Sequence, residues 1–263
     1  MNLTGRSVLL TGATGGIGHA IAQELHRAGA QLTITGRRTD VLEPLADSLG
    51  AAALAADLSD PAAVSDLAER CADVDILVAN AALPASGELQ SFTVEQIDRA
   101  LQVNLRAPIV LTRLLTERMA ERGSGHVVLI SSIAGRATSA GGSIYSATKF
   151  GLRGFGQALR MDLLDSGVGV SVVFPGFIRD AGMYHDSGAR LPGFVGTSTP
   201  AQVARGVIAA IEGDRGEVTV APLSVRAGTK FAELAPGVAS RVAMRIGGKR
   251  VAADLREGQA AKR

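Results

Sequence analysis

The feature that most constrains the fold is a regular alternation of short apolar runs with longer segments of helical period. Most of the short runs are continuously apolar, as expected for strands that are covered on both faces of a sheet. Parallel strands need helical crossovers, so the alternation predicts an α/β fold with a doubly wound parallel sheet of about seven strands. The expected strands are residues 7–11, 31–35, 52–56, 75–79, 126–131, 170–174 and 217–221. The expected helices are residues 16–29, 39–49, 61–72, 93–121, 143–167 and 200–213.

The length of 263 residues suits a single domain of this kind, which we assign to residues 1–222. Within it, residues 176–199 show little regular pattern and are expected to form a mobile loop over a ligand site. Residues 223–263 follow as a helical tail with nine Lys and Arg against three acids, although the whole chain has a net charge of only +2. This basic amphipathic tail can cover the edge of the protein itself, contact another subunit or lie on an anionic membrane, the last being the least favoured.

Hydropathy and cysteine content indicate a cytoplasmic protein. No apolar run reaches the roughly 18 residues that cross a bilayer, and the first residues enter a strand pattern without room for a signal peptide. Cys71 is the only cysteine, which excludes an internal disulfide. The four histidines have no ligand-like spacing, so no metal is expected, and the chain lacks the aromatic interleaving of a nucleic-acid surface.

A glycine-rich turn joins the first expected strand to the first expected helix. Its sequence, TGATGGIG over residues 11–18, places four glycines at this junction. Glycines there permit positive φ and let backbone N–H groups approach a pyrophosphate, which the N-terminus of the following helix also faces. The position in the first βα unit therefore predicts the dinucleotide site of a Rossmann-like fold.

The end of the second strand indicates which dinucleotide is bound. A site for NAD(H) usually has an acidic residue there, whereas a site for the 2′-phosphate of NADP(H) uses arginine. Here the strand ends at Gly36, and Arg37 and Arg38 follow. We therefore expect NADP(H) to be preferred, with NAD(H) still possible. Asp57, at the end of the third strand, is placed to accept a hydrogen bond from the adenine amino group.

Tyr145 and Lys149 stand four residues apart in a chain that has only two tyrosines. This spacing places both on one face of the expected helix 143–167. A free tyrosine, with a pKa of about 10, is a poor base near neutrality, and a neighbouring positive charge favours its phenolate. The pair is thus expected to handle the proton that accompanies hydride transfer to or from a carbon–oxygen group. Ser132, at the end of the fifth strand, is placed to orient the substrate oxygen.

Taken together, these motifs resemble the short-chain dehydrogenase/reductase family over residues 5 to about 221. The matches follow one another in the order that the family shows. They are Thr11, Gly12, Gly16 and Gly18 of the motif TGxxxGxG, Asn80 of the NAG motif, the helix asparagine Asn104, the serine Ser132, the YxxxK pair Tyr145 and Lys149, and the PG motif Pro175-Gly176.

The resemblance implies roles for these residues. Tyr145 is the acid in carbonyl reduction and the base in alcohol oxidation, and Ser132 holds the substrate oxygen. Lys149 lowers the tyrosine pKa and binds the nicotinamide ribose, while Asn104 supports the proton relay. The implied cofactor site consists of Thr11, Gly12, Gly15, Gly16, Ile17, Gly18, Arg37, Arg38, Asp57, Leu58, Asn80, Tyr145, Lys149, Pro175, Gly176 and Ile178.

Two residues depart from the family pattern. Ala82 stands where the NAG motif has glycine, a change that is tolerated if the backbone keeps a negative φ. Asp180 stands where the family often has a threonine that bonds the nicotinamide carboxamide. An ionised carboxylate accepts but does not donate, so the role of Asp180 is open, and pairing with Arg179 is one alternative.

The leading hypothesis is an NADP(H)-preferring oxidoreductase that interconverts a ketone or aldehyde with an alcohol. The alternative is a non-catalytic dinucleotide-binding sensor or regulatory protein. The substrate is expected to be a small molecule, bound largely by residues 176–199 and 83–92. The family resemblance also suggests a homodimer or homotetramer built through helices 93–121 and 143–167.

Overall fold

The computed structural model describes residues 1–189, 191–193 and 195–259, and its centre is a single parallel sheet. The sheet has seven strands in the order β3-β2-β1-β4-β5-β6-β7, and every neighbouring pair is parallel. The predicted doubly wound α/β fold is thereby confirmed. The strands are β1 (Ser7–Thr11), β2 (Gln31–Gly36), β3 (Ala52–Ala55), β4 (Ile76–Ala79), β5 (Gly125–Ile130), β6 (Val168–Pro175) and β7 (Glu217–Val220).

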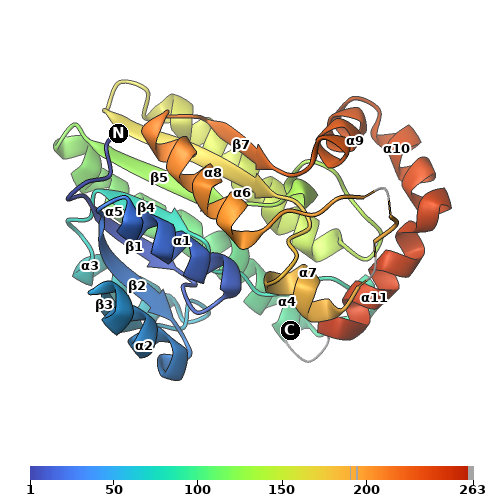
Figure 1. Ribbon diagram of the computed structural model, residues 1–263, viewed down its shortest axis with the longest axis horizontal. Helices are drawn as coiled ribbons and strands as arrows, with labels where there is room; N and C mark the ends of the chain where they lie inside the picture. Colours follow the sequence, from blue (N-terminus) through green and yellow to red (C-terminus); the bar gives the residue numbers. More distant parts are fainter. Residues whose placement is uncertain (190, 194, 260–263) are drawn as a thin grey trace.

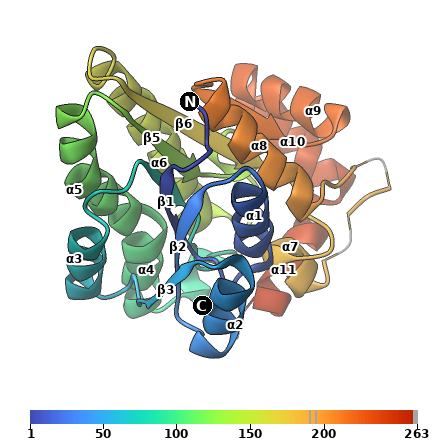
Figure 2. The same ribbon diagram turned by 60° about the vertical axis from the view of Figure 1, so that its left-hand side comes forward.

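Helices cover both faces of this sheet (Figure 1, Figure 2). One face carries α1 (Gly16–Arg27), α2 (Thr39–Leu49) and α8 (Pro200–Glu212), with α1 packed directly on α8. The other face carries α3 (Pro61–Arg70), α4 (Val94–Leu101), α5 (Ala107–Glu121) and α6 (Ser143–Asp162). The arrangement has three layers, because each crossover helix returns the chain to the start of the next parallel strand.

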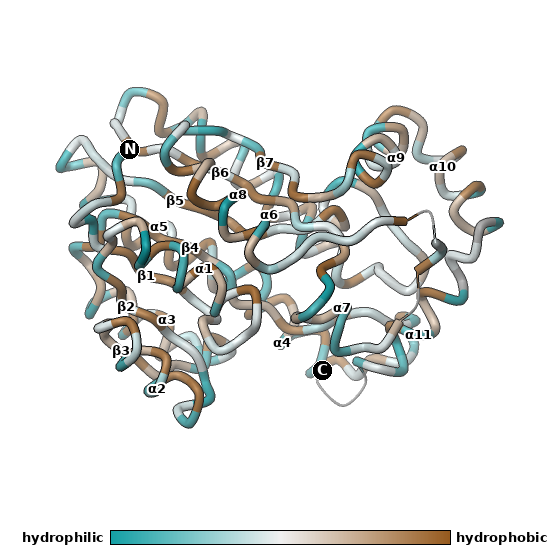
Figure 3. Tube along the Cα trace, in the orientation of Figure 1, coloured by the Kyte–Doolittle hydropathy of each residue, from teal (hydrophilic) through white to brown (hydrophobic). Residues whose placement is uncertain are grey.

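The core lies on the two faces of the sheet, and single strands contribute to both. In β1, Val8 and Leu10 pack under α1 and α2, whereas Leu9 points to the opposite face, towards α3 and α5. All three side chains are inaccessible to solvent. This alternation explains why the strands are continuously apolar in sequence, which Figure 3 shows as hydrophobic colour along the centre of the molecule.

Local signals fix several helix starts. Thr93 and Thr199 each form a capping box, with Gln96 and Gln202 respectively. The stretch predicted as one helix over 93–121 is instead interrupted, because a π-helical turn at Gln102–Arg106 separates α4 from α5. Such a turn inserts an extra residue into the helix and often marks a functional position.

The tail folds into α9 (Leu223–Leu234), α10 (Pro236–Ala243), a π-helical turn (Met244–Gly248) and α11 (Lys249–Gln259). As Figure 1 shows, α9 follows β7 at the edge of the sheet, and α11 turns back to α7 (Gly182–Ser187), against which it packs. The tail therefore covers an edge of the protein itself, which was one of the three alternatives. In the described part of the chain, no helix is long and apolar enough to cross a membrane.

Candidate active site

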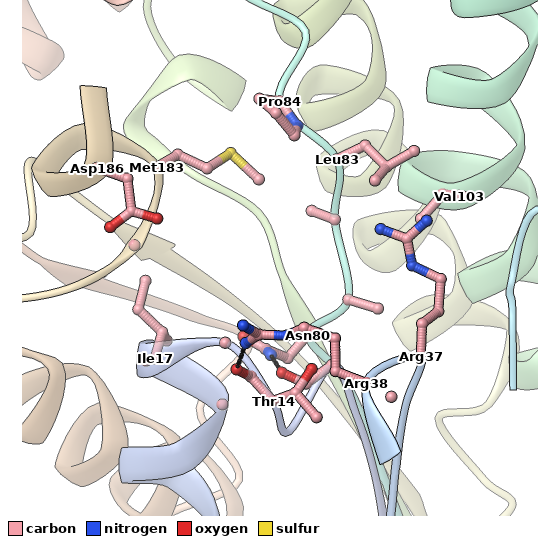
Figure 4. Close-up of a pocket in the computed structure, with 18 of the residues that line it drawn as sticks. Thr14, Ile17, Arg37, Arg38, Asn80, Leu83, Pro84, Val103, Met183 and Asp186 are labelled. Carbon is pink, nitrogen blue, oxygen red and sulfur yellow. Dashed lines mark hydrogen bonds between the residues drawn. The ribbon is translucent and has the colours of Figure 1, made fainter. Parts of the chain in front are cut away.

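A cavity of about 700 Å³ opens at the carboxyl ends of the strands, where the sheet order reverses between β1 and β4. This is the position at which open α/β sheets bind ligands, and the volume is typical of small-molecule sites. We call it the switch-point cavity. Figure 4 shows its walls: Thr14 from the β1–α1 turn, Ile17 from the start of α1, Arg37 and Arg38 after β2, Leu83 and Pro84 after β4, and Met183 and Asp186 from α7.

Two positions of the glycine-rich turn require glycine, because a Cβ there would clash with neighbouring main-chain atoms. Gly12 has a φ of 68°, and a Cβ on it would lie 2.7 Å from the Cα of Ala81. A Cβ on Gly18 would lie 2.1 Å from the carbonyl oxygen of Gly12. The turn thus presents bare backbone to the switch-point cavity at the N-terminus of α1, the arrangement that binds a pyrophosphate.

Thr11 and Asn80 hold this turn against the end of β4. The Oγ1 of Thr11 accepts hydrogen bonds from the backbone nitrogens of Asn80 and Ala81, both at 3.0 Å. The Nδ2 of Asn80 donates in return to the carbonyl oxygens of Thr11 and Gly12, at 3.0 and 3.1 Å. These reciprocal bonds fix the floor of the cavity, so Thr11 supports the site from beneath.

Two arginines and one carboxylate occupy the side of the cavity at the end of β2. Arg38 donates a hydrogen bond to the main-chain oxygen of Thr14, and Arg37 lies 3.9 Å from the Oδ2 of Asp57. Burial acts to raise the pKa of Asp57, but hydrogen bonds from Ser59 and the positive charges of Arg37 and Arg99 outweigh it and lower the pKa. Asp57 is therefore ionised at neutral pH, and both arginine side chains remain at the cavity wall (Figure 4).

The end of β5 and the start of α6 bring Ser132, Tyr145 and Lys149 together. The Nζ of Lys149 donates to the carbonyl oxygen of Ile130 at 2.9 Å, and Ser131 donates to the carbonyl oxygen of Lys149 at 2.8 Å. These bonds lock the helix to the strand end. They bring the side chains of Ser132 and Tyr145 into hydrogen-bonding contact, with the Lys149 ammonium 5.6 Å from the centre of the tyrosine ring.

Burial dominates the pKa values of Tyr145 and Lys149. Burial raises the pKa of Tyr145 to about 12, and the hydrogen bond with Ser132 only partly opposes this. Burial also lowers the pKa of Lys149 to about 8. In the chain alone burial dominates the pKa of Tyr145 and the Lys149 ammonium bonds Ile130, so the expected lowering of the tyrosine pKa by the lysine stays a prediction. Tyr145 is a protonated phenol at neutral pH.

Comparison with known proteins identifies the family of the chain. The family model for short chain dehydrogenases matches residues 6–191, which is more than half of the chain. The chain belongs to the short-chain dehydrogenase family. It is therefore an oxidoreductase, and it contains the family's NAD(P)-binding domain.

Individual relatives cover most of the chain. The ketoacyl reductase HetN of a Nostoc species is 37% identical over 227 residues, which are 83% of this chain and 79% of that protein. A 3-oxoacyl-[acyl-carrier-protein] reductase of Rickettsia prowazekii is 33% identical over 68% of this chain and 75% of its own length. Among solved structures, a short-chain dehydrogenase from Sphingobium yanoikuyae in complex with NADPH matches with a TM-score of 0.78 and 30% identity, covering 88% of this chain and 93% of that one.

The helix asparagine of this short-chain dehydrogenase, Asn104, lies in the π-helical turn and is fully buried. Its Oδ1 accepts from the backbone nitrogen of Leu83 at 2.6 Å, and its Nδ2 donates to the carbonyl oxygen of Leu83 at 2.9 Å. The side chain is thus engaged with the segment that follows β4. It positions that wall of the switch-point cavity, and its part in a proton relay stays a prediction.

The two departures from the family pattern have different outcomes. Among the described non-glycine residues only Asp180 and Asp214 have positive φ, so Ala82 meets the condition for replacing glycine. Asp180 has a φ of 72°, lines the switch-point cavity and lies 3.6 Å from Arg179. The pairing foreseen as an alternative therefore exists, and both side chains remain well exposed.

The segment 176–199 is more regular than predicted in its described residues. It contains α7 and a bridge between Ile178 and Ser198, and its Ala181 packs where a Cβ on Gly16 would stand, 2.3 Å away. The sequence did not predict α7, because a helix of only six residues is too short to show a helical period. As expected, the segment forms a wall of the switch-point cavity.

The structure brings ten of the predicted cofactor residues to the switch-point cavity: Gly12, Gly15, Gly16, Ile17, Gly18, Arg37, Arg38, Asp57, Leu58 and Asn80. It places the others beneath or beyond the cavity wall: Thr11, Tyr145, Lys149, Pro175, Gly176 and Ile178. Ser132 and Asn104 likewise do not line it. The cavity also includes residues that the motifs missed, among them Thr14, Arg99, Val103, Met183, Gly258 and Gln259. Thr14, inside the glycine motif, and Met183, inside the segment 176–199, carried a signal for their places.

Proposed function

We propose that this short-chain dehydrogenase interconverts a ketone or aldehyde with the corresponding alcohol and that it prefers NADP(H). The observation that carries the proposal is the contact between Ser132 and Tyr145, held beside Lys149 at the end of β5. The ketoacyl reductases among the relatives act on a carbonyl group, as their names state, and they support this reaction type.

Tyr145 and Ser132 have different roles in carbonyl reduction. The bound nicotinamide supplies the hydride. Tyr145, whose pKa of about 12 keeps it protonated, donates the proton to the substrate oxygen. The Oγ of Ser132 accepts from the backbone nitrogen of Ala134 at 3.1 Å, so its own hydrogen is free to bind that oxygen or the tyrosine. In alcohol oxidation the same residue, once it has lost its own proton, acts as the base that accepts the proton of the alcohol.

The preference for NADP(H) rests on charge at the end of β2. Arg37 and Arg38 line the switch-point cavity there, and β2 ends in Gly36 in place of an acidic residue. A Cβ on Gly36 would lie 2.7 Å from the Cγ2 of Thr14, so an acidic side chain at this position would crowd the Thr14 side chain in the phosphate turn. The solved relative in complex with NADPH supports the same preference.

The reaction is tested by following NADPH and NADH consumption with ketones and aldehydes of graded chain length. Tyr145→Phe removes only the hydroxyl and is expected to lower turnover by about 10²-fold or more, the scale of general acid catalysis. Near-normal turnover in this variant would remove Tyr145 as the acid. Tight NADPH binding without turnover of any carbonyl in wild type would favour the sensor hypothesis.

The cofactor preference is tested separately by binding. Arg37→Ala and Arg38→Ala are expected to weaken NADPH binding by about tenfold each, the scale of one hydrogen bond to a charged group, while NADH binding changes little. Fluorescence titration of both dinucleotides measures this. An equal loss for NADH in both variants would mean that the arginines do not contact the 2′-phosphate.

We also propose that the protein assembles as a homodimer or homotetramer through helices 93–121 and 143–167. Exposed apolar side chains on this side of the molecule support it, namely Leu114 on α5 with Met161 and Leu164 at the end of α6. Light scattering coupled to size exclusion measures the mass. A monomer at micromolar concentration would contradict the assembly.

A further inference from the structure

A second cavity, of about 740 Å³, lies between the tail and the catalytic domain. We call it the tail cavity. Its walls come from α9 and α10 on one side and from residues 136–138, the first half of α6 and the segment after β6 on the other. Most of its lining side chains are apolar, including Phe150, Phe177, Val225, Phe231 and Val242. A lining of this kind and a volume of this size are typical of sites for small ligands.

The tail cavity begins where three segments of the active site end. Arg136 follows Ser132 by four residues, across a single turn of 3-10 helix at Ile133–Gly135. Phe150 directly follows Lys149, and Phe177 follows the Pro175-Gly176 pair at the end of β6. Each of these three segments thus carries a predicted catalytic or cofactor residue and, a few positions later, a residue that lines the tail cavity. These short separations along the chain keep the wall of the tail cavity close to the predicted catalytic residues, although Ser132, Tyr145 and Lys149 do not line it themselves.

An ion-pair cluster holds α9 against the domain and shapes the tail cavity. Glu233 of α9 lies 3.2 Å from Arg136 and 2.8 Å from Arg153, and Glu217 of β7 pairs with the same two arginines. Lys230 also lies 3.4 Å from Glu233. The charged residues on the cavity wall, Arg136, Arg153 and Glu233, are therefore neutralised by partners within the described structure. A charged ligand gains little from groups that are already paired, whereas a neutral apolar ligand requires no charged partner.

Large apolar side chains stand exposed at this cavity. Phe150, Phe231 and Val242 have 39%, 47% and 45% of their surface accessible, although most large apolar residues of the domain are buried. Apolar surface gathered around a cavity marks a site at which a ligand removes that surface from water. Each methylene placed there contributes about 0.8 kcal/mol at most, so affinity should rise with chain length.

We propose that the tail cavity binds an uncharged apolar chain of the carbonyl substrate, so that this enzyme selects long-chain ketones or aldehydes over short ones. The proposal rests on the proposed function for the identity of the reacting group. In this proposal the tail selects substrates by chain length, and the residues near the ends of β5 and β6 carry out the reaction.

Gly228 offers a specific test because it lines the tail cavity and a Cβ there would meet no atom within 4 Å. Gly228→Phe fills the cavity, and Gly228→Ala adds only a methyl group at the same position. Gly237→Phe is the matched control, because Gly237 lies in α10, has equally free space at its Cβ and does not line the cavity.

The first readout is the ratio of kcat/KM for 2-dodecanone to kcat/KM for 2-butanone with NADPH. We expect wild type, Gly228→Ala and Gly237→Phe to prefer 2-dodecanone, and Gly228→Phe to lower the ratio by about tenfold or more, as for the loss of a few buried methylenes. An unchanged ratio in Gly228→Phe, or a wild type without preference for the longer ketone, would overturn the proposal.

The second readout separates this proposal from the proposed function. Calorimetric titration with 2-dodecanone needs no turnover, so it reports on the tail cavity even if the protein reduces no ketone. Binding to wild type and Gly237→Phe that weakens about tenfold in Gly228→Phe would support the cavity as a chain-binding site. Absence of binding to wild type, or equal binding to all variants, would overturn it.

Discussion

Replacing Lys149 by methionine should make the protein more stable while it removes a residue that the proposed reaction uses. Lys149 is only 2% exposed, and burial lowers its pKa from 10.5 to about 8. At 1.36 kcal/mol per pKa unit, holding the charged lysine in the folded state costs about 3 kcal/mol. Methionine has similar length and no charge. It loses the hydrogen bond to Ile130, worth about 1 kcal/mol, so the net gain at pH 7 is about 2 kcal/mol.

The pH dependence of this gain identifies its cause. Between pH 8 and 10.5 the unfolded lysine binds a proton that the folded lysine has released, so wild-type stability rises with pH across this window. The cost is complete below about pH 8 and falls to about 1 kcal/mol at pH 9.5, where the advantage of Lys149→Met should be close to zero.

Urea unfolding of the cofactor-free proteins, followed by far-UV circular dichroism at pH 7 and 9.5, measures both values. All other titrating groups are common to the two proteins, so the difference in the free energy of unfolding isolates Lys149. A variant that is less stable at pH 7, or a difference that is the same at both pH values, would refute the reasoning.

Two further predictions concern the phosphate turn and the core. Gly18→Ala places a Cβ 2.1 Å from the Gly12 carbonyl oxygen and should weaken NADPH binding by about tenfold or more in a fluorescence titration. Gly154→Ala is the control and should bind normally, because Gly154 lies in α6 outside the switch-point cavity and its Cβ would meet no atom within 4 Å. Burial lowers the pKa of His126 from 6.5 to about 4, so the unfolded chain binds the extra proton in this range and stability should fall by about 3 kcal/mol from pH 7 to pH 4. His126→Gln should flatten that loss in acid unfolding curves; an equally steep loss would point to other groups.

The sheet and the cofactor side of the site could be predicted because their signals are local. Strands buried on both faces must be apolar throughout, as in β1 and β5, and the helices between them differ in period. Positions 12 and 18 require glycine, because a Cβ there would clash with nearby main-chain atoms. The position of Tyr145 relative to Lys149 follows from the helical repeat alone.

Other features depend on contacts between distant parts of the chain, which leave no local pattern. Gln259 reaches the switch-point cavity because α11 packs on α7, where its Nε2 donates to the carbonyl oxygen of Met183 at 3.3 Å. The raised pKa of Tyr145 results from burial, which the spacing of charges in the sequence does not indicate. The cytoplasmic location, the division at residue 222 and the catalytic roles stay predictions.

The manner in which the tail is attached has an evolutionary consequence. The family match ends at residue 191, and α9 is tied to the domain by the ion pairs of Glu233 with Arg136 and Arg153. Mutations that alter α9 and α10 leave the strand ends and the phosphate turn untouched. If the tail cavity binds the substrate chain as proposed, selection on α9 and α10 would change chain-length specificity in descendants of this gene while the inherited catalytic residues stay the same.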